Sequence, residues 1–296
     1  MRFGDDPESR NYIDDTGRGG GLGGGFGGGN ALGCLLPLIA SRFGIGGVVV
    51  LVIGYFLLSS LGGGLGGIGG GGSVTPSSQV GQTAAKSNLD PAIKHFSLQV
   101  LGSTEKTWNQ LLGGKYQPTP LVFYSESDRS GCGMAQSAMG PFYCPNDGRI
   151  YLDTEFFSEL SRRFQAPGDF AMAYVIAHEV GHHVQDLQGT LTQAHDLQAR
   201  ASETEGNAIQ VKVELQADCY AGVWAKNAKN SQGQSVMEPG DFEEGMRAAE
   251  AIGDDTLQRQ SQGRVVPDSF THGTSAQRME ALQRGYTTGD PNACKF

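Results

Sequence analysis

The chain has 296 residues, enough for one or two domains, and a formal net charge of −9. A mildly acidic chain cannot hold phosphate backbones electrostatically, so nucleic acid is not expected as a partner. Of the 46 glycines, 25 lie before Ser73. Because glycine pays a large ordering entropy and offers no side chain to bury, we expect the globular domain to be residues 88–296.

Three segments are predicted to precede this domain. Residues 1–42 carry Gly-Gly-Gly repeats and are predicted to be a disordered cytoplasmic tail. Residues 43–61 carry no charge, and as a helix they would span about 28 Å, close to the thickness of a membrane's hydrocarbon layer. Residues 62–87 are rich in Gly, Ser and Thr and are predicted to be a flexible linker.

The orientation of this predicted transmembrane helix follows from the charges beside it. Arg42 directly precedes the apolar run, and the next Lys or Arg is Lys86. The positive-inside rule therefore predicts a single-pass membrane protein with its N-terminus in the cytoplasm and its domain outside. A buried Gly-rich helix pair or a disordered apolar tract is the alternative interpretation of residues 43–61.

Within the domain, the apolar spacing predicts an α+β fold that is mostly helical and contains a small sheet. Asp169 and Gly189 are predicted to cap one helix, Asp241 to cap another, and Thr274 with Gln277 to form a capping box. An Asn-Asp-Gly turn is predicted between the second and third strands. The predicted strands are Leu121–Tyr124, Phe142–Cys144 and Arg149–Leu152, and the predicted helices are Asp90–Leu112, Asp169–Gly189, Glu203–Asn227, one from Asp241, and one from Thr274 through Gln283.

The domain contains four cysteines, an even number that allows three pairings. An extracytoplasmic domain lies in an oxidising compartment, so we expect disulfides between cysteines near in sequence, Cys132–Cys144 and Cys219–Cys294. Cys34 stands apart, before the apolar run. Four buried free thiols in a cytosolic protein are the alternative.

The strongest chemical signal is His178-Glu179-Val180-Gly181-His182. Two histidines at i and i+4 lie one helical turn apart on one face, so both imidazoles can reach the same cation. Glu179 lies about 100° around the helix from His178, where it can accept a proton from water beside the metal. Surface histidines on an amphipathic helix are the alternative, but the apolar run Tyr174–Ala177 indicates a buried helix.

A catalytic zinc site takes three protein ligands and leaves one position for water. Glu214, Asp218, His195 and His272 are the candidates for the third ligand. We favour Glu214, because its apolar neighbours indicate a buried helix, and buried carboxylates need partners. Asp218 lies four residues later on the same face, where it can accept a hydrogen bond from a ligand histidine. The alternative is a solvated acidic helix face.

Further motifs lie on both sides of the His-Glu helix. They are Gly140–Pro145, Ile150–Asp153, Glu214–Ala225, Thr271–Thr274 and Thr288–Asp290. Together with the His-Glu helix they resemble the bacterial family of neutral zinc metallopeptidases. The resemblance covers nearly the whole chain and implies a zincin-like catalytic domain with one Zn²⁺. The third-ligand segment also resembles that of gluzincins, in which the Glu binds zinc and the Asp supports a ligand histidine; this implies the same roles for Glu214 and Asp218.

His272 is the candidate for a second donor to the oxyanion of a tetrahedral intermediate. The alternative is a loop histidine without a role. Arg278 is expected to pair with an acid, and His183, His95 and His195 are expected to be structural. The strand beginning at Phe142 could pair with an extended substrate if it lies at a sheet edge.

The expected function is therefore zinc-dependent hydrolysis of peptide bonds by a membrane-anchored endopeptidase. With the bacterial resemblance, the expected location is the bacterial cytoplasmic membrane, with the domain facing the periplasm or the exterior. A catalytically idle, zinc-stabilised scaffold of the envelope is the alternative from another class, and a zinc amidase acting on cell-wall crosslinks is a third hypothesis. A scaffold would not need Glu179, so its presence favours an enzyme.

Overall fold

The computed structural model describes residues 1–17, 87–162 and 164–296. The predicted transmembrane helix, residues 43–61, lies outside the described residues, as do nearly all of the predicted linker and residues 18–42 of the predicted tail. Within the described part of the chain, no helix combines the length and the apolar character needed to cross a membrane. The anchor therefore stays a prediction.

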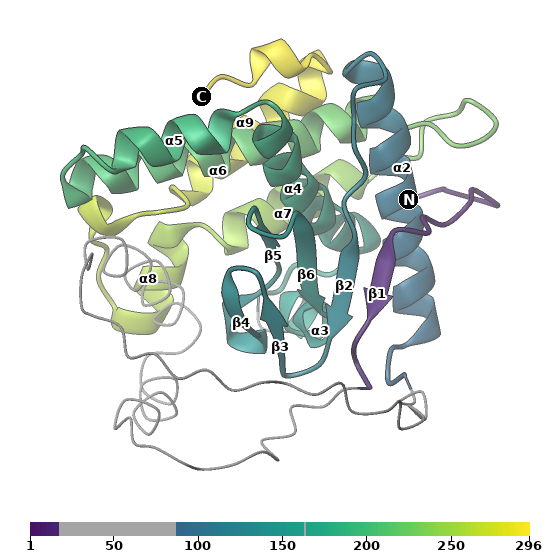
Figure 1. Ribbon diagram of the computed structural model, residues 1–296, viewed down its shortest axis with the longest axis horizontal. Coiled ribbons are helices and arrows are strands. Elements are labelled where there is room, and N and C mark those ends of the chain that lie inside the picture. Colours follow the sequence, from purple (N-terminus) through teal and green to yellow (C-terminus); the bar gives the residue numbers. More distant parts are fainter. Residues whose placement is uncertain (18–86, 163) are drawn as a thin grey trace, which may run out of the picture.

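The fold is α+β and mostly helical, as the sequence predicts (Figure 1). The main sheet has the order β1-β2-β6-β5, in which β1, β2 and β6 are parallel and β5 is antiparallel to β6. A β3–β4 hairpin forms a second sheet. The strands are β1 (Tyr12–Asp14), β2 (Leu121–Tyr124), β3 (Ser127–Ser130), β4 (Gly133–Gln136), β5 (Phe142–Cys144) and β6 (Arg149–Asp153).

The helices lie mainly on one side of this sheet (Figure 1). Successive residues of a strand point to opposite faces of its sheet. Leu121 and Phe123 of β2 therefore pack into the main core with the helices, and Val122 and Tyr124 pack into a smaller cluster on the other face. The helices are α2 (Pro91–Leu111), α3 (Glu155–Arg162), α4 (Asp169–Leu187), α5 (Thr190–Gln198), α6 (Glu203–Asn227), α7 (Asp241–Ala251), α8 (Asp254–Gln262) and α9 (Ser275–Thr288).

Helix α6 packs between α4 and α9, and glycines let the backbones approach. A Cβ atom on Gly181 of α4 would lie 3.0 Å from the Ala217 carbonyl oxygen of α6. A Cβ atom on Gly285 of α9 would lie 1.9 Å from the Cys219 carbonyl oxygen of α6. The side chains of α6 are thus held at fixed distances from the His-Glu helix and from α9.

Local capping chemistry agrees with the sequence at some helix ends and differs at others. Thr274 and Gln277 form the predicted capping box of α9, which continues to Thr288 rather than ending at Gln283. Asp169 and Asp241, predicted as N-caps, are instead the first residues of α4 and α7, which follow Gly168 and Gly240. Their carboxylates instead form ion pairs with the amino group of Met1.

Two disulfides close the predicted pairs, Cys132–Cys144 and Cys219–Cys294. The first joins the loop between β3 and β4 to the end of β5. The second joins the middle of α6 to the segment that follows α9. Each disulfide therefore fixes a segment beside an element of the predicted site.

The prediction of a disordered tail is wrong for residues 1–17. Phe3 is buried in the main core, and β1 adds a parallel edge strand next to β2. The Ser9 amide donates to the Leu98 carbonyl at 2.9 Å, and Gln99 on α2 donates to the carbonyl oxygens of Gly4 and Asp6. The glycine repeats dominate the composition of the tail, but they begin only after this segment, which carries its own apolar and polar anchors.

Candidate metal centre

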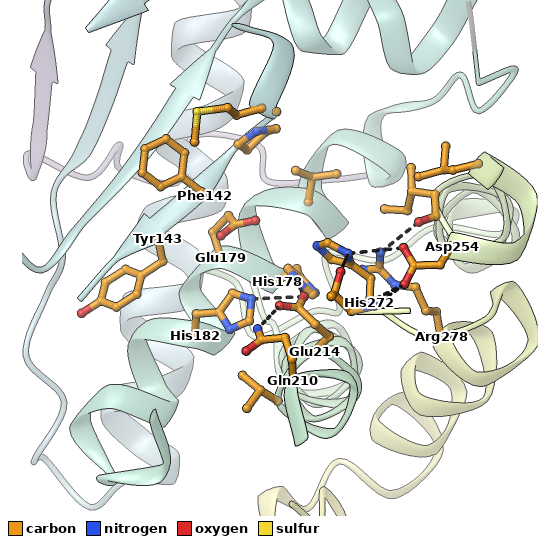
Figure 2. Close-up of a pocket in the computed structure, with 18 of the residues that line it drawn as sticks. Phe142, Tyr143, His178, Glu179, His182, Gln210, Glu214, Asp254, His272 and Arg278 are labelled. Atoms are coloured by element: carbon orange, nitrogen blue, oxygen red, sulfur yellow. Dashed lines mark hydrogen bonds and ion pairs between the residues drawn. The ribbon is translucent and has the colours of Figure 1, made fainter. Parts of the chain in front are cut away.

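Three side chains from two helices, α4 and α6, converge in one pocket (Figure 2). His178 and His182 lie one turn apart on α4, with ring centroids 4.7 Å apart. Glu214 Oε2 on α6 lies 3.2 Å from His178 Nε2 and 3.5 Å from His182 Nε2. The donor atoms of the three residues all lie within 4.8 Å of one another, so a single ion can contact all three. The structure thus brings together the three predicted ligands.

Asp218 orients the first histidine, as predicted. Its Oδ1 atom lies 2.7 Å from His178 Nδ1, and the carboxylate is fully buried. Arg278 donates to both carboxylate oxygens, at 2.8 and 2.9 Å, and the hydroxyl of Tyr174 donates at 2.5 Å. Because a carboxylate only accepts, His178 carries a proton on Nδ1, and Nε2 is the atom that faces Glu214 and the ligand group.

The second histidine is oriented by an amide rather than an acid. His182 Nδ1 lies 2.8 Å from Oε1 of Gln185, which is completely buried one turn later on α4. Glu214 is held in turn by Gln210, whose Nε2 donates to Glu214 Oε1 at 2.9 Å. All three candidate ligands therefore have a polar partner that fixes their orientation.

The electrostatics of the cluster keep its carboxylates ionised. Burial would raise the pKa of Glu214, but the His182 and His272 imidazoles outweigh it and hold this pKa well below its usual range. Burial likewise opposes ionisation of Asp218, but Arg278 and His178 lower its pKa. In the absence of an ion, burial would lower the pKa of His178, and the Asp218 carboxylate instead raises it to about 10. The ionised carboxylates of Glu214 and Asp218 can therefore balance the charge of a bound cation.

The predicted general base lies at the same place. Glu179 lines a cleft of about 940 Å³ together with the three candidate ligands. The residue is 7 % exposed, and among the described residues no hydrogen bond to its carboxylate is seen. The carboxylate is therefore free to bond water or substrate within the cleft (Figure 2).

His272 reaches the cleft from a loop that is folded around Asp254 (Figure 2). Asp254 Oδ2 accepts from the backbone amides of Thr271, His272 and Gly273, at 2.7, 2.7 and 3.2 Å. Its Oδ1 lies 3.4 Å from His272 Nδ1, which also lies 3.1 Å from the Thr271 hydroxyl. Burial would lower the pKa of His272, but the Glu214 and Asp254 carboxylates raise it.

Strand β5 borders the cleft and is an edge strand of the main sheet. Phe142 and Tyr143 of this strand line the cleft, together with apolar side chains from helices on the other sides. The sequence left open whether this strand lies at a sheet edge. Among the residues that the structure describes, β5 pairs only with β6, so its other side is unpaired. An extended peptide could add to it as a further strand.

The remaining histidines are not part of the donor group. His183 is buried, with Nε2 2.6 Å from the Gln117 carbonyl oxygen and Nδ1 3.1 Å from the Tyr143 hydroxyl. His95 lies 2.6 Å from Glu8 at the surface. His195, a candidate third ligand, is exposed on α5 and lies outside the three-residue donor group.

Four supporting residues were not predicted: Tyr174, Gln185, Gln210 and Asp254. Spacing could have suggested the first three, because each lies three or four residues from a candidate ligand on the same helix. Asp254 had no such signal. It contacts His272 only because the chain folds back over eighteen residues.

The donor set fits zinc. Two imidazole Nε2 atoms and one carboxylate converge, and each Nδ1 is already satisfied by Asp218 or Gln185. Two histidines and a glutamate are a ligand set of catalytic zinc, which leaves a coordination position for water or substrate. The cleft beside them provides the space for it.

Comparison with known proteins agrees with this metal site. The chain is 49% identical over 250 residues to "Uncharacterized protein YpfJ" of Escherichia coli (strain K12), covering 83% of each chain. It is 44% identical over 200 residues to "Uncharacterized protein Rv2575" of Mycobacterium tuberculosis (strain ATCC 25618 / H37Rv), covering 65% of this chain and 66% of the other. No solved structure matches. The family model described as "Putative neutral zinc metallopeptidase" matches residues 1–296, so the chain belongs to that family and Zn²⁺ is its metal.

Proposed function

We propose that this protein is a zinc-dependent endopeptidase that hydrolyses peptide bonds in an extended substrate. One observation carries the proposal: Glu179 lines the same cleft as the His178, His182 and Glu214 donor group, beside the open edge of β5. A site that only stabilised the fold would be expected to be closed by a fourth protein ligand, with no need for a carboxylate facing the cleft.

When bound, zinc supplies Lewis acidity, which polarises the substrate carbonyl and lowers the pKa of a water toward neutrality. Glu179 acts as general base, taking a proton from the attacking water and later passing it to the leaving amine. His272 donates a hydrogen bond to the oxygen that becomes negative as the carbonyl is attacked. Asp218 and Gln185 keep the two histidines in the tautomers that leave Nε2 free.

Substrate binding is proposed to use the backbone more than particular side chains. β5 offers its free edge to an extended peptide, and main-chain hydrogen bonds of this kind give affinity with little sequence choice. Phe142 and the other apolar residues of the cleft favour apolar substrate side chains near the cleaved bond. The proposed substrates are therefore peptides or unfolded segments of proteins.

The proposed site of action is outside the cytoplasm, at the bacterial cytoplasmic membrane. The two disulfides support this, because such bonds persist in oxidising compartments. Attachment through the apolar residues 43–61 is part of the proposal.

The test of catalysis is Glu179→Gln in the full chain. We expect turnover of a peptide library to be lost, while zinc content stays near one per chain, because Glu179 moves the proton but does not hold the metal. The library digest is compared with and without a chelator, and metal content is measured directly. An unchanged digest by the variant would refute the mechanism. Zinc binding without any digest by the natural chain would instead favour the scaffold.

A further inference from the structure

His182, the second zinc ligand, is hydrogen-bonded to a series of buried side-chain amides. Gln185 Oε1 lies 2.8 Å from His182 Nδ1, and Gln185 Nε2 donates to the Val213 carbonyl at 2.8 Å and to Gln216 Oε1 at 2.9 Å. Gln216 Nε2 donates in turn to the carbonyl oxygen of Cys294 at 2.9 Å. Gln185 is completely buried, and Gln216 is 6 % exposed.

The direction of every hydrogen bond in this series of amides follows from the carbonyl oxygens at its ends. The carbonyl oxygens of Val213 and Cys294 can only accept, so each must face the NH₂ group of its glutamine. Gln216 then presents Oε1 to Gln185, and Gln185, with both N–H groups used, presents Oε1 to His182. An oxygen at that position requires the proton on His182 Nδ1, which leaves Nε2 unprotonated and ready to bind the metal.

Rotating either amide by 180° would place acceptor atoms against acceptor atoms in a buried site. If Gln185 were turned, its oxygen would face the Val213 carbonyl and Gln216 Oε1 without a hydrogen between them. Buried acceptor atoms without a donor destabilise the folded state. The arrangement seen is therefore the one that pairs all of the groups.

The residue at the far end of this series of amides, Cys294, is held covalently. Cys294 follows α9, and its disulfide to Cys219 ties it to α6, three residues beyond Gln216. The disulfide thus holds the Cys294 carbonyl where Gln216 needs an acceptor. The other disulfide, Cys132–Cys144, does not take part in these hydrogen bonds and provides a natural control.

We propose that Gln185 and Gln216 are positioning residues that connect the zinc ligand His182 to the disulfide-held Cys294. They set the tautomer and the ring orientation of His182, as Asp218 does for His178. This inference rests on the zinc site and not on peptidase activity, so metal binding alone tests it.

The main experiment measures zinc affinity of the full chain by competition with a chromophoric chelator. We expect Gln185→Met, which keeps the length of the side chain but removes its polar groups, to weaken zinc binding about 10- to 100-fold. Gln216→Met should weaken binding less, because the Val213 carbonyl still orients Gln185. The paired change Cys219→Ser with Cys294→Ser should act in the same direction.

Two controls separate positioning from general stability. Gln99→Met also removes a buried glutamine with two hydrogen bonds, but on α2, where it contacts Gly4 and Asp6. We expect it to lower the melting temperature and leave zinc affinity unchanged. Cys132→Ser with Cys144→Ser should likewise leave zinc affinity unchanged.

The proposal is overturned if Gln185→Met binds zinc like the natural chain, or if Gln99→Met loses as much affinity. If only Gln185→Met weakens binding, the connection from Gln216 to Cys294 is refuted. Gln216→Met keeps the disulfide intact, so this connection remains testable if the cysteine variants do not fold. Failure of Glu179→Gln to stop turnover would not affect any of these outcomes.

Discussion

At the scale of single residues, the two sides of the proposed zinc are supported by different chemistry. His178 is held by an ionised carboxylate, which is itself paired with Arg278, whereas His182 is held by a neutral amide. A carboxylate makes its histidine a more basic ligand, while an amide orients it without adding charge. Of the two groups that hydrogen-bond the ligand histidines, only Asp218 is therefore an acid and adds negative charge.

His272 offers a prediction at this scale. We expect His272→Phe to lower kcat about 100-fold, because the proposed oxyanion would lose one donor, while zinc content stays unchanged. Steady-state kinetics with a single peptide substrate, together with metal analysis, measure both. His195→Phe is the matched control, since His195 is exposed on α5 and does not line the cleft. Equal activity of the two variants would remove His272 from the mechanism.

At the scale of elements, the site depends on the close approach of α6 to α4 and α9. Glu214 and Asp218 lie on α6, their histidine partners on α4, and Arg278 on α9. At the crossing of α6 and α9, a Cβ atom on Gly222 would lie 2.2 Å from the Leu282 carbonyl oxygen. Glycine is needed at these positions because the backbone itself fills the space.

Gly285→Ala tests this packing. Its added Cβ would meet the Cys219 carbonyl oxygen at 1.9 Å, so the helices must move apart. We expect a loss of about 1–3 kcal/mol in the free energy of unfolding, measured by denaturant titration. Gly206→Ala is the control within α6, because its Cβ would meet nothing within 4 Å. Helix propensity predicts that this change stabilises the protein by up to about 1 kcal/mol; equal effects of the two changes would argue against the steric explanation.

At the scale of the whole molecule, residues 1–17 and the domain form one folded body. The Met1 amino group pairs with Asp169 and Asp241 at the starts of α4 and α7, and β1 completes the sheet opposite β5 (Figure 1). A chain that crossed a membrane once between residues 17 and 87 would place these parts on opposite faces. The contacts of residues 1–17 and a single crossing by residues 43–61 therefore exclude one another, and the single-pass topology stays a prediction.

We expect residues 1–17 to lie on the same side of the membrane as the domain. Single cysteines at two exposed positions, Arg10→Cys and Arg264→Cys, test this in a chain that carries Cys34→Ser. A membrane-impermeant thiol reagent applied to intact cells should label both positions or neither. Labelling of Arg264→Cys alone would show that the N-terminus lies inside and that β1 does not pair with β2 in the membrane-bound protein.

Much of the site could be predicted from the sequence, because it is encoded locally. His178 and His182 share a face wherever their segment is helical, and Thr274 with Gln277 reads as a capping box from spacing alone. The third ligand is not encoded by spacing to the histidines. The sequence favours Glu214 over the other acids and histidines only because its helix is apolar. Asp254 could not be assigned a role, because its contact with His272 is set by how segments far apart in the chain pack.

The sequence by itself determined strands β2, β5 and β6, helices α2, α4, α6, α7 and α9, the pair of histidines and the likeness to a zinc metallopeptidase family. Helical periodicity and motif spacing are properties of neighbouring residues, which is why these features could be predicted. Only the tertiary structure decided which acid joins the histidines, that β5 is an edge strand and that residues 1–17 belong to the folded body. Those features depend on distances between segments far apart in the chain. Such distances are set by packing across the whole core, including the glycine crossings of α6, and not by any local pattern.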